Sequence, residues 1–398
     1  MTLTPRLTLI IAILVLFLGK AINKKVSFLR NFNIPEAVTG GVLASIIFGL
    51  IYLVAGVQLQ FALGIRDSFL LIFFTTIGLS SKISTLIRGG KPLLILLVAA
   101  VSYLVIQNLT GVIVAGITGL ELPVGLLAGS VSLSGGHGTT IAWSPIFVND
   151  YGIKNAAEIG IASATFGLIL GGVIGGPISK FLINKYKLES TSNESLTVGI
   201  ENNQEHTQIE YNGMLLTILV IAIAIGLGIQ FNHLLTSLGL KLPDFVACLF
   251  VGIVMTNLVP LIFKNISWPA NTPSMALLAD LSLGLFLSIS LMSLELWTLA
   301  DLAGPVLFLL LAQLLVIILY GMFFIFRIMG KSYDAAVIVG GYLGLGLGAT
   351  PTAIANMTAI TEEFGPSPQA FIIVPLVGAF FIDISNAIII QRFLNHLG

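Results

Sequence analysis

Ten apolar stretches, separated by polar or glycine-rich segments, run along the 398 residues of the chain. All but the short third stretch reach the length of about 17 residues or more that a helix needs to cross the roughly 30 Å hydrocarbon core of a bilayer. The pattern predicts an all-α polytopic membrane protein. The stretches lie near residues 3–20, 35–56, 67–81, 92–119, 155–183, 213–231, 243–263, 275–294, 303–328 and 369–394.

Two glycine-rich segments lie between stretches at corresponding places, near 123–147 after the fourth and near 334–361 after the ninth. Glycine costs about 1 kcal/mol per residue inside a helix, so these clusters predict broken helices. Broken backbone at membrane depth is tolerated only where protein or water satisfies it. Paired interruptions in two repeats point to the binding site of a transporter. We therefore predict a re-entrant hairpin at each segment.

Further matches in the same order indicate that the two halves are repeats. The Ile-Pro-Glu sequence at 34–36 matches Leu-Pro-Asp at 242–244, and residues 74–81 line up with 286–293. Because each half has an odd number of apolar stretches, the second repeat is predicted to be inverted. The predicted organisation is an N-terminal five-helix repeat over 1–185, a polar cytoplasmic linker over 186–211 and an inverted C-terminal five-helix repeat over 212–398.

The positive charges predict how the chain is oriented. If the N-terminus is outside and each glycine segment enters and leaves on one face, most of the 18 Lys and Arg residues are cytoplasmic, as the positive-inside rule requires. The first hairpin then enters from outside and the second from the cytoplasm, so that their tips meet near mid-membrane. Both termini are predicted to be periplasmic. The basic residues left outside are Arg6, Arg66, Lys154, Lys241 and Arg392.

Composition excludes several classes of protein. Only 9% of residues are charged, against about 25% in soluble domains, and the net charge of zero gives no indication of a nucleic-acid partner. The single cysteine, Cys248, excludes an intrachain disulfide and a multi-cysteine metal site. Residues 135–140 lack the lysine of a phosphate-binding loop, and 344–348 lack the acid that follows Gly-x-Gly in intramembrane aspartyl proteases. We expect no enzyme activity, no metal site and no organic cofactor.

The two glycine segments carry groups suited to small charged solutes. Backbone N–H groups at helix N-termini and in glycine nests bind anions, while carbonyl and hydroxyl oxygens bind a hard cation such as Na⁺. The alternative is that the glycines allow close helix packing and the hydroxyls join helices. The predicted substrate-binding residues are Ser132, Ser134, Gly135, Gly136, His137, Gly138 and Thr139 in the first segment and Gly346, Gly348, Thr350, Thr352 and Asn356 in the second.

Other polar residues interrupt the apolar stretches. Asp383 lies deep in the last stretch with Asn386 one turn on, and an intramembrane carboxylate is a functional candidate for binding Na⁺, a proton or a substrate ammonium. His137 is either a packed, hydrogen-bonded imidazole or a group that contacts substrate or a proton. Gln107 and Asn108 either line the solute path or join helices. The predicted ion-binding residues are Asp383, Asn386, Asn356 and Ser134.

These residues carry a family resemblance. Residues 132–139 (Ser-Leu-Ser-Gly-Gly-His-Gly-Thr) resemble the first loop of the bacterial sodium/glutamate symporters, the glutamate:Na⁺ symporter family, and residues 346–357 resemble the second. Residues 364–367, 374–383 and 386–388 extend the match through the last stretch. Members often show Gly-Gly-x-Gly-Gly in the loops. Here Thr139 replaces the last glycine of the first loop, and the second reads Gly-Leu-Gly-Ala.

The resemblance implies import of L-glutamate by Na⁺ symport, with Na⁺ as the coupling ion. It also implies two inverted five-helix repeats, opposed re-entrant loops, and a homodimer in which a transport domain moves against a scaffold. The resemblance further implies the lipid bilayer of the bacterial inner membrane as the setting. A Na⁺- or proton-coupled carrier for hydroxycarboxylates is the main alternative. An ion channel is disfavoured because inverted duplication is typical of alternating access.

Overall fold

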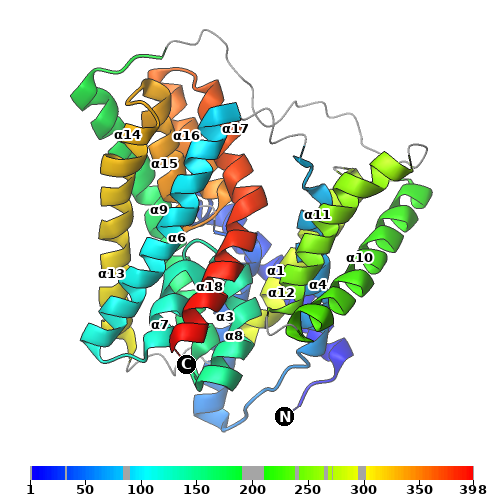
Figure 1. Cartoon of the computed structure of the whole chain (residues 1–398). Helices are drawn as coiled ribbons and strands as arrows, with labels where there is room; N and C mark the ends of the chain where they lie inside the picture. The colour runs from blue at the N-terminus through cyan, green and yellow to red at the C-terminus, as the bar shows by residue number, and fades with distance from the viewer. Residues whose placement is uncertain are drawn as a thin grey trace. The chain divides into compact units, whose positions relative to one another are not determined.

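The computed structural model describes residues 2–31, 34–83, 90–190, 210–237, 242–263, 268–270, 272–294 and 302–397. In these ranges the regular elements are helices, apart from an isolated bridge between Thr2 and Gln60 (Figure 1). The chain divides into two compact units. The first comprises Met1–Ile83 and Gln204–Thr298, and the second comprises Ser84–Asn203 and Leu299–Gly398. Each unit therefore draws on both halves of the sequence.

The first unit pairs matching helices from the two halves. Helix α3 packs on α1 and α12, and α11 packs in the same way on α10 and α4. These neighbours are the ones expected if α1, α3 and α4 correspond to α10, α11 and α12. The elements of the unit are α1 (Pro5–Lys25), α2 (Ser27–Asn31), α3 (Glu36–Ala55), α4 (Gly64–Ser80), α10 (Tyr211–Ser237), α11 (Asp244–Ile262) and α12 (Pro273–Met292).

A matched asparagine fixes the entry to α3 and to α11. Asn23 Nδ2 donates to the carbonyl oxygen of Ile34 at 2.8 Å, and Asn232 Nδ2 donates to that of Leu242 at 3.0 Å. Each of these carbonyls precedes the proline that opens the next helix, and an acidic first residue complements the helix dipole. The two asparagines are a repeat signal that the sequence comparison above did not use.

The second unit holds both glycine segments as helical hairpins. Hairpin 1 is α7, η1 and α8, and hairpin 2 is α15 and α16; Figure 1 shows hairpin 2 toward the upper end of this unit and hairpin 1 toward its lower end. Helix α9 packs on both hairpins. The elements are α6 (Gly90–Thr118), α7 (Leu122–Leu126), η1 (Leu127–Val131), α8 (Gly136–Tyr151), α9 (Ala156–Tyr186), α13 (Ala303–Leu319), η3 (Tyr320–Ile325), α14 (Phe326–Ile328), α15 (Tyr333–Leu347), α16 (Thr350–Phe364), α17 (Pro368–Val377), η4 (Gly378–Ile382) and α18 (Asp383–Leu397).

Eight helices in the described part are long and apolar enough to cross a membrane. All eight coincide with predicted stretches, which confirms the all-α, multi-pass prediction. The third predicted stretch is the 17-residue helix α4. The tenth is divided into α17, the π-helical segment η4 and α18; the label η denotes a π-helix throughout. Most of the predicted linker, residues 191–209, lies outside the described residues. The inverted arrangement, the orientation of the termini and the repeat boundaries stay predictions.

Candidate functional site

The helix of hairpin 1 breaks before the glycine cluster at residues 135–138, where the sequence predicts the break. Gly129, inside η1, has φ −105° and ψ −125°, which is not helical. The helix resumes at α8 with Gly136, whose φ of +69° lies in the left-handed region that strains a side-chain-bearing residue. Residues 132–135 form the turn between these points, and Thr139 lies near the start of α8. The sequence located the break within a few residues, but tertiary contacts decide where it falls.

Hairpin 2 breaks at a single point. Helix α15 continues through Gly346 and ends at Leu347, Gly348 adopts φ −146° and ψ −96°, and α16 starts at Thr350 with a proline in its first turn. Proline is pre-organised for the start of a helix because its φ is fixed and it lacks the N–H. Both α8 and α16 therefore begin at a hairpin tip.

The tips of the two hairpins meet. A methyl group placed on Gly136 lies 3.6 Å from the carbonyl oxygen of Gly348. Ser134 Oγ lies 2.6 Å from Gln107 Oε1 and 3.2 Å from the carbonyl oxygen of Gly346, to which Gln107 Nε2 also donates at 3.2 Å. Two segments more than 200 residues apart thus share one hydrogen-bond network through α6. Since α8 and α16 start here, the positive ends of two helix dipoles lie at the tips.

A glycine stripe on α9 allows its backbone to contact both hairpins. Glycines at 160, 167, 171 and 175 follow helical spacing along one face. A methyl group on Gly160 lies 2.3 Å from Thr140 Cγ2 in hairpin 1, and one on Gly167 lies 2.2 Å from the carbonyl oxygen of Leu347 in hairpin 2. This stripe was not predicted, although its spacing is readable in the sequence. A larger residue on this face would separate α9 from a hairpin.

The side chains of three predicted substrate-binding residues form hydrogen bonds with other residues of this unit. Ser132 Oγ donates to the carbonyl oxygen of Leu127 at 2.5 Å and accepts from Thr140 Oγ1 at 2.9 Å. Asn356 Nδ2 donates to the carbonyl oxygens of Gly171 and Gly340 at 2.9 and 3.2 Å. The buried His137 has its Nε2 at 3.0 Å from Thr165 Oγ1. These bonds brace the hairpins, as in the packing alternative, and their predicted ligand roles stay predictions.

Two other predicted residues present unpaired hydroxyls near the starts of the hairpin helices. Thr139 in α8 is 4% exposed and Thr352 in α16 is fully buried, yet neither Oγ1 atom has a hydrogen-bond partner among the described residues. An unsatisfied buried polar group costs about 1–3 kcal/mol, so a ligand or water at this position is favoured. The remaining predicted positions supply backbone or helix starts at the tips: Gly135, Gly138, Gly346, Gly348 and Thr350.

The two predicted ion-binding residues of the last stretch differ in burial and in hydrogen bonding. Asn386 is fully buried and its Nδ2 donates to the carbonyl oxygen of Ser130 in hairpin 1 at 2.8 Å. Asp383 starts α18 directly after η4, is half-buried, and makes no hydrogen bond or ion pair with any described residue. Within the described ranges no three His, Cys, Asp or Glu side chains form a metal-binding group.

Two functional candidates were missed by the sequence analysis. Gln313 is the one polar residue of α13; it is fully buried, and its Nε2 donates to the carbonyl oxygen of Gln107 at 2.8 Å. Tyr103 is fully buried with its ring centroid 5.0 Å from that of Tyr320, and its hydroxyl has no partner among the described residues. A lone amide in an apolar span was a readable signal for Gln313. Nothing in the sequence marks Tyr103.

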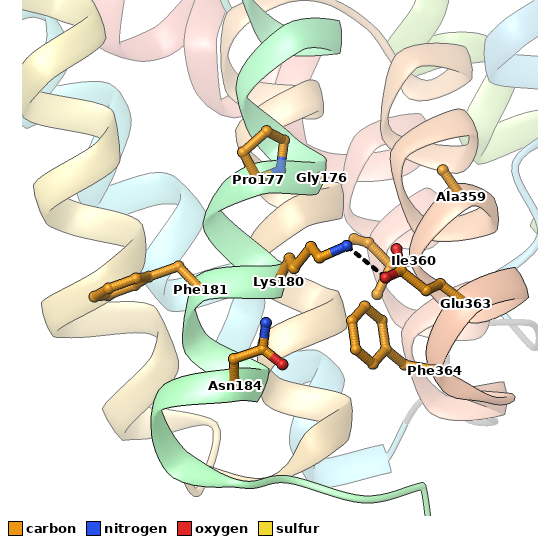
Figure 2. A pocket seen from close by; sticks show the side chains of 9 residues that line it. All are labelled: Gly176, Pro177, Lys180, Phe181, Asn184, Ala359, Ile360, Glu363 and Phe364. Carbon is orange, nitrogen blue, oxygen red and sulfur yellow. Dashed lines mark hydrogen bonds and ion pairs between the residues drawn. The ribbon is translucent and has the colours of Figure 1, made fainter.

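A groove of about 530 Å³ lies between α9 and α16. In Figure 2 the Lys180 side chain extends from α9 toward Glu363 of α16, and Lys180 Nζ lies 2.5 Å from Glu363 Oε1. The same Nζ lies 5.7 Å from the ring centroid of Phe364. Both charged side chains are about half exposed. The ion pair thus joins the C-terminal half of α9 to hairpin 2.

The chain matches a known family over most of its length. Residues 1–366 match the model of the family described as Sodium/glutamate symporter. The chain belongs to the sodium/glutamate symporter family. Two relatives named Sodium/glutamate symporter are similar: one from Escherichia coli strain K12 (44% identity, 97% of this chain and 96% of the relative) and one from Haemophilus influenzae strain Rd (42% identity, 96% and 95%).

The family match confirms the resemblance drawn from residues 132–139 and 346–357. It covers both hairpins and ends before α17, whereas the alignment with the Escherichia coli relative spans 393 residues. Among solved structures, the sodium proton antiporter MjNhaP1 from Methanocaldococcus jannaschii at pH 8 covers 98% of both chains at 16% identity, with a TM-score of 0.43.

Proposed function

We propose that this protein imports L-glutamate across the bacterial inner membrane by symport with Na⁺. The observation that carries the proposal is the 42–44% identity, over nearly the whole chain, to relatives named Sodium/glutamate symporter. Eight helices fit to span a membrane agree with a multi-pass carrier. The family is one of transporters, and the protein is proposed not to be an enzyme and to need no organic cofactor.

The substrate is proposed to bind at the meeting tips of hairpins 1 and 2, which act as re-entrant loops from opposite faces. The approach of Gly136 to Gly348 and the start of α8 and α16 at these tips support this assignment. Each carboxylate of glutamate accepts hydrogen bonds from backbone N–H groups at a helix start. The unpaired hydroxyls of Thr139 and Thr352 add one donor from each hairpin.

Asp383 is proposed to hold either Na⁺ or the ammonium of the substrate. Its carboxylate is unpaired within the described residues and lies inside the last apolar stretch, where an uncompensated charge is costly. Binding of a cation there compensates this charge. Because coupling between two bound ligands is reciprocal, a site that favours Na⁺ when glutamate is bound also favours glutamate when Na⁺ is bound.

The two compact units are proposed to have different tasks. The second unit contains both hairpins and moves as the transport domain, while the first is the scaffold of a homodimer. The assembly of each unit from both halves of the sequence supports this division, because inverted repeats let one body rock between two faces.

The decisive experiment is uptake of radiolabelled glutamate into proteoliposomes with an inward Na⁺ gradient. Uptake is expected to exceed that in a matched K⁺ gradient and to vanish when an ionophore removes the Na⁺ gradient. Equal uptake in both gradients contradicts Na⁺ coupling. Competition by citrate or malate but not by aspartate indicates a hydroxycarboxylate carrier, and conductance far above carrier turnover in planar bilayers indicates a channel.

A further inference from the structure

Four polar side chains from four elements surround the break in hairpin 1. They are Asn108 of α6, Ser130 of η1, Gln313 of α13 and Asn386 of α18, and we name them the Gly129 cluster. A methyl group placed on Gly129 lies 3.4 Å from both Asn108 Oδ1 and Gln313 Nε2. All four side chains are fully buried. The cluster is distinct from the network at the hairpin tips.

Backbone hydrogen bonds fix the orientation of the three amides. Asn108 Oδ1 accepts from the Ser130 N–H at 3.3 Å. Gln313 Nε2 donates to the carbonyl oxygen of Gln107 at 2.8 Å, and Asn386 Nδ2 donates to that of Ser130 at 2.8 Å. Turning either of these last two amides around would place oxygen against oxygen. The free ends are therefore Gln313 Oε1, Asn386 Oδ1 and Asn108 Nδ2.

These free ends, together with Ser130 Oγ, have no hydrogen-bond partner among the described residues. Buried polar groups are nearly always satisfied, and folded proteins contain only a few exceptions per hundred residues. Four exceptions around one glycine therefore indicate that a ligand completes the cluster. Three of the four atoms are oxygens, the ligand type that a hard cation prefers.

We propose that the Gly129 cluster binds one Na⁺ through Gln313 Oε1, Asn386 Oδ1 and Ser130 Oγ, with Asn108 Nδ2 donating to a water in the ion's coordination shell. The inference rests on the proposed Na⁺ symport and locates a coupling ion away from the hairpin tips. Asn108 is a positioning residue, because its Oδ1 holds the Ser130 backbone. Asn386 was expected to bind an ion, but Ser130 and Gln313 were not.

The cluster is connected to the substrate site through one residue. The backbone carbonyl of Gln107 accepts from Gln313, and the side chain of Gln107 contacts Ser134 and Gly346 at the tips. An ion that fixes Gln313 and η1 therefore fixes the α6 segment that joins the tips. Na⁺ binding is thus expected to precede glutamate binding and to raise glutamate affinity.

The test measures ²²Na⁺ binding to purified full-length protein without glutamate, at constant ionic strength with choline as the replacement cation. Ser130→Ala and Gln313→Met each remove one oxygen ligand and are expected to raise the half-saturating Na⁺ concentration about tenfold, which is about 1.4 kcal/mol. The matched control is Ser163→Ala, because Ser163 is fully buried and, within the described ranges, its hydroxyl bonds only to the carbonyl oxygen of Ile159 in its own helix. All variants are first compared for monodispersity.

Unchanged Na⁺ binding in both cluster variants overturns the proposal and leaves an ordered water as the occupant, since water also satisfies two to four buried polar groups. No Na⁺ binding by the wild type without glutamate overturns it as well. Failure of the proposed function looks different, because uptake by the wild type would then be independent of Na⁺. A second readout is glutamate affinity, which in Ser130→Ala is expected to return to the wild-type value at saturating Na⁺.

Discussion

The hydroxyl oxygen of Ser134 lies 3.2 Å from the backbone carbonyl oxygen of Gly346, in the opposite half of the chain. Ser134 belongs to the turn of hairpin 1, and Gly346 precedes the break of hairpin 2. Gln107 contacts both, so the two tips are joined by neutral hydrogen bonds. Each such bond contributes about 1 kcal/mol, which is strong enough to order the tips and weak enough to exchange with a ligand.

Replacing Gln107 with leucine is expected to lower kcat/KM for glutamate uptake by about tenfold or more. The substitution removes two tip hydrogen bonds worth about 1 kcal/mol each and leaves a carbonyl and a hydroxyl to find new partners. The measurement is initial uptake rate in proteoliposomes. The control is Gln391→Leu, because the side chain of the buried Gln391 donates, in the part of the chain that the structure describes, only to Asn395 in its own helix. Wild-type kinetics in Gln107→Leu would show that the network does not shape the site.

Thr139→Val and Thr352→Val are expected to weaken glutamate binding, because each removes an unpaired hydroxyl near a hairpin tip without changing side-chain volume much. A hydrogen bond to a carboxylate contributes about 1.5–3 kcal/mol, or roughly one to two orders of magnitude in affinity. Equilibrium binding of labelled glutamate at saturating Na⁺ measures the loss.

The matched control for these threonines is Thr217→Val. Thr217 in α10 is fully buried and donates to the carbonyl oxygen of Gly213 one turn earlier. Thermal stability of Thr139→Val and Thr352→Val is expected to stay at or above the wild-type value, because an unsatisfied buried hydroxyl is removed. Equal affinity in the control and in both tip variants would exclude these hydroxyls from the substrate site.

Asp383→Asn is expected to abolish or strongly reduce the dependence of glutamate uptake on Na⁺. The substitution keeps the side-chain size and removes the unpaired negative charge that the proposed cation compensates. The dependence is measured as uptake rate against Na⁺ concentration, and Asp150→Asn is the control because Asp150 is exposed at the end of α8. If Asp383→Asn keeps the wild-type Na⁺ curve but raises the KM for glutamate, Asp383 holds the substrate ammonium; if both stay unchanged, its proposed role is withdrawn.

The sequence predicted the helices well because apolar length alone decides whether a segment can span a bilayer. It located the interruptions less well. Gly346 stays helical within α15, and its lack of a side chain serves close packing, since a methyl group there would lie 2.7 Å from Ile317 Cδ1. Gly129, by contrast, departs from helical geometry where Asn108 of α6 and Asn386 of α18 bond to the backbone N–H and carbonyl of the next residue, Ser130. Helix propensity identifies where interrupting a helix costs little free energy, whereas the partners that stabilise the interruption come from distant segments.

Chain order also concealed which residues share a site. Asn356 reads as a ligand in sequence, but the close approach of Gly171 and Gly340 turns its amide toward two backbone carbonyls. Gln313 reads as an isolated polar residue, yet it meets α6 beside the hairpin 1 break. Side-chain direction depends on how the hairpins pack on α6, α9 and α13, and helices that are apolar on all faces carry no pattern that encodes that packing.

The Lys180–Glu363 ion pair is expected to have a small effect on transport by itself. Both side chains are about half exposed, and such pairs contribute at most about 1 kcal/mol, so Glu363→Gln should change the maximal uptake rate by less than about fivefold. The double substitution Lys180→Glu with Glu363→Lys restores the pair with opposite polarity and should return the rate to the wild-type value. A change of a hundredfold in Glu363→Gln would contradict a purely electrostatic contact at this groove.

A covalent link across the same groove is expected to be far more damaging, because hairpin 2 must separate from α9 if it opens at this end (Figure 2). Cysteines are introduced by Lys180→Cys and Glu363→Cys in a Cys248→Ala background. A short, reversible bis-methanethiosulfonate linker then joins the two introduced thiols. Uptake should fall to background and recover when the linker is reduced. The two single-cysteine variants, treated in the same way, control for modification alone. Full activity of the linked protein would mean that α9 and hairpin 2 move as one body, and that glutamate is released elsewhere.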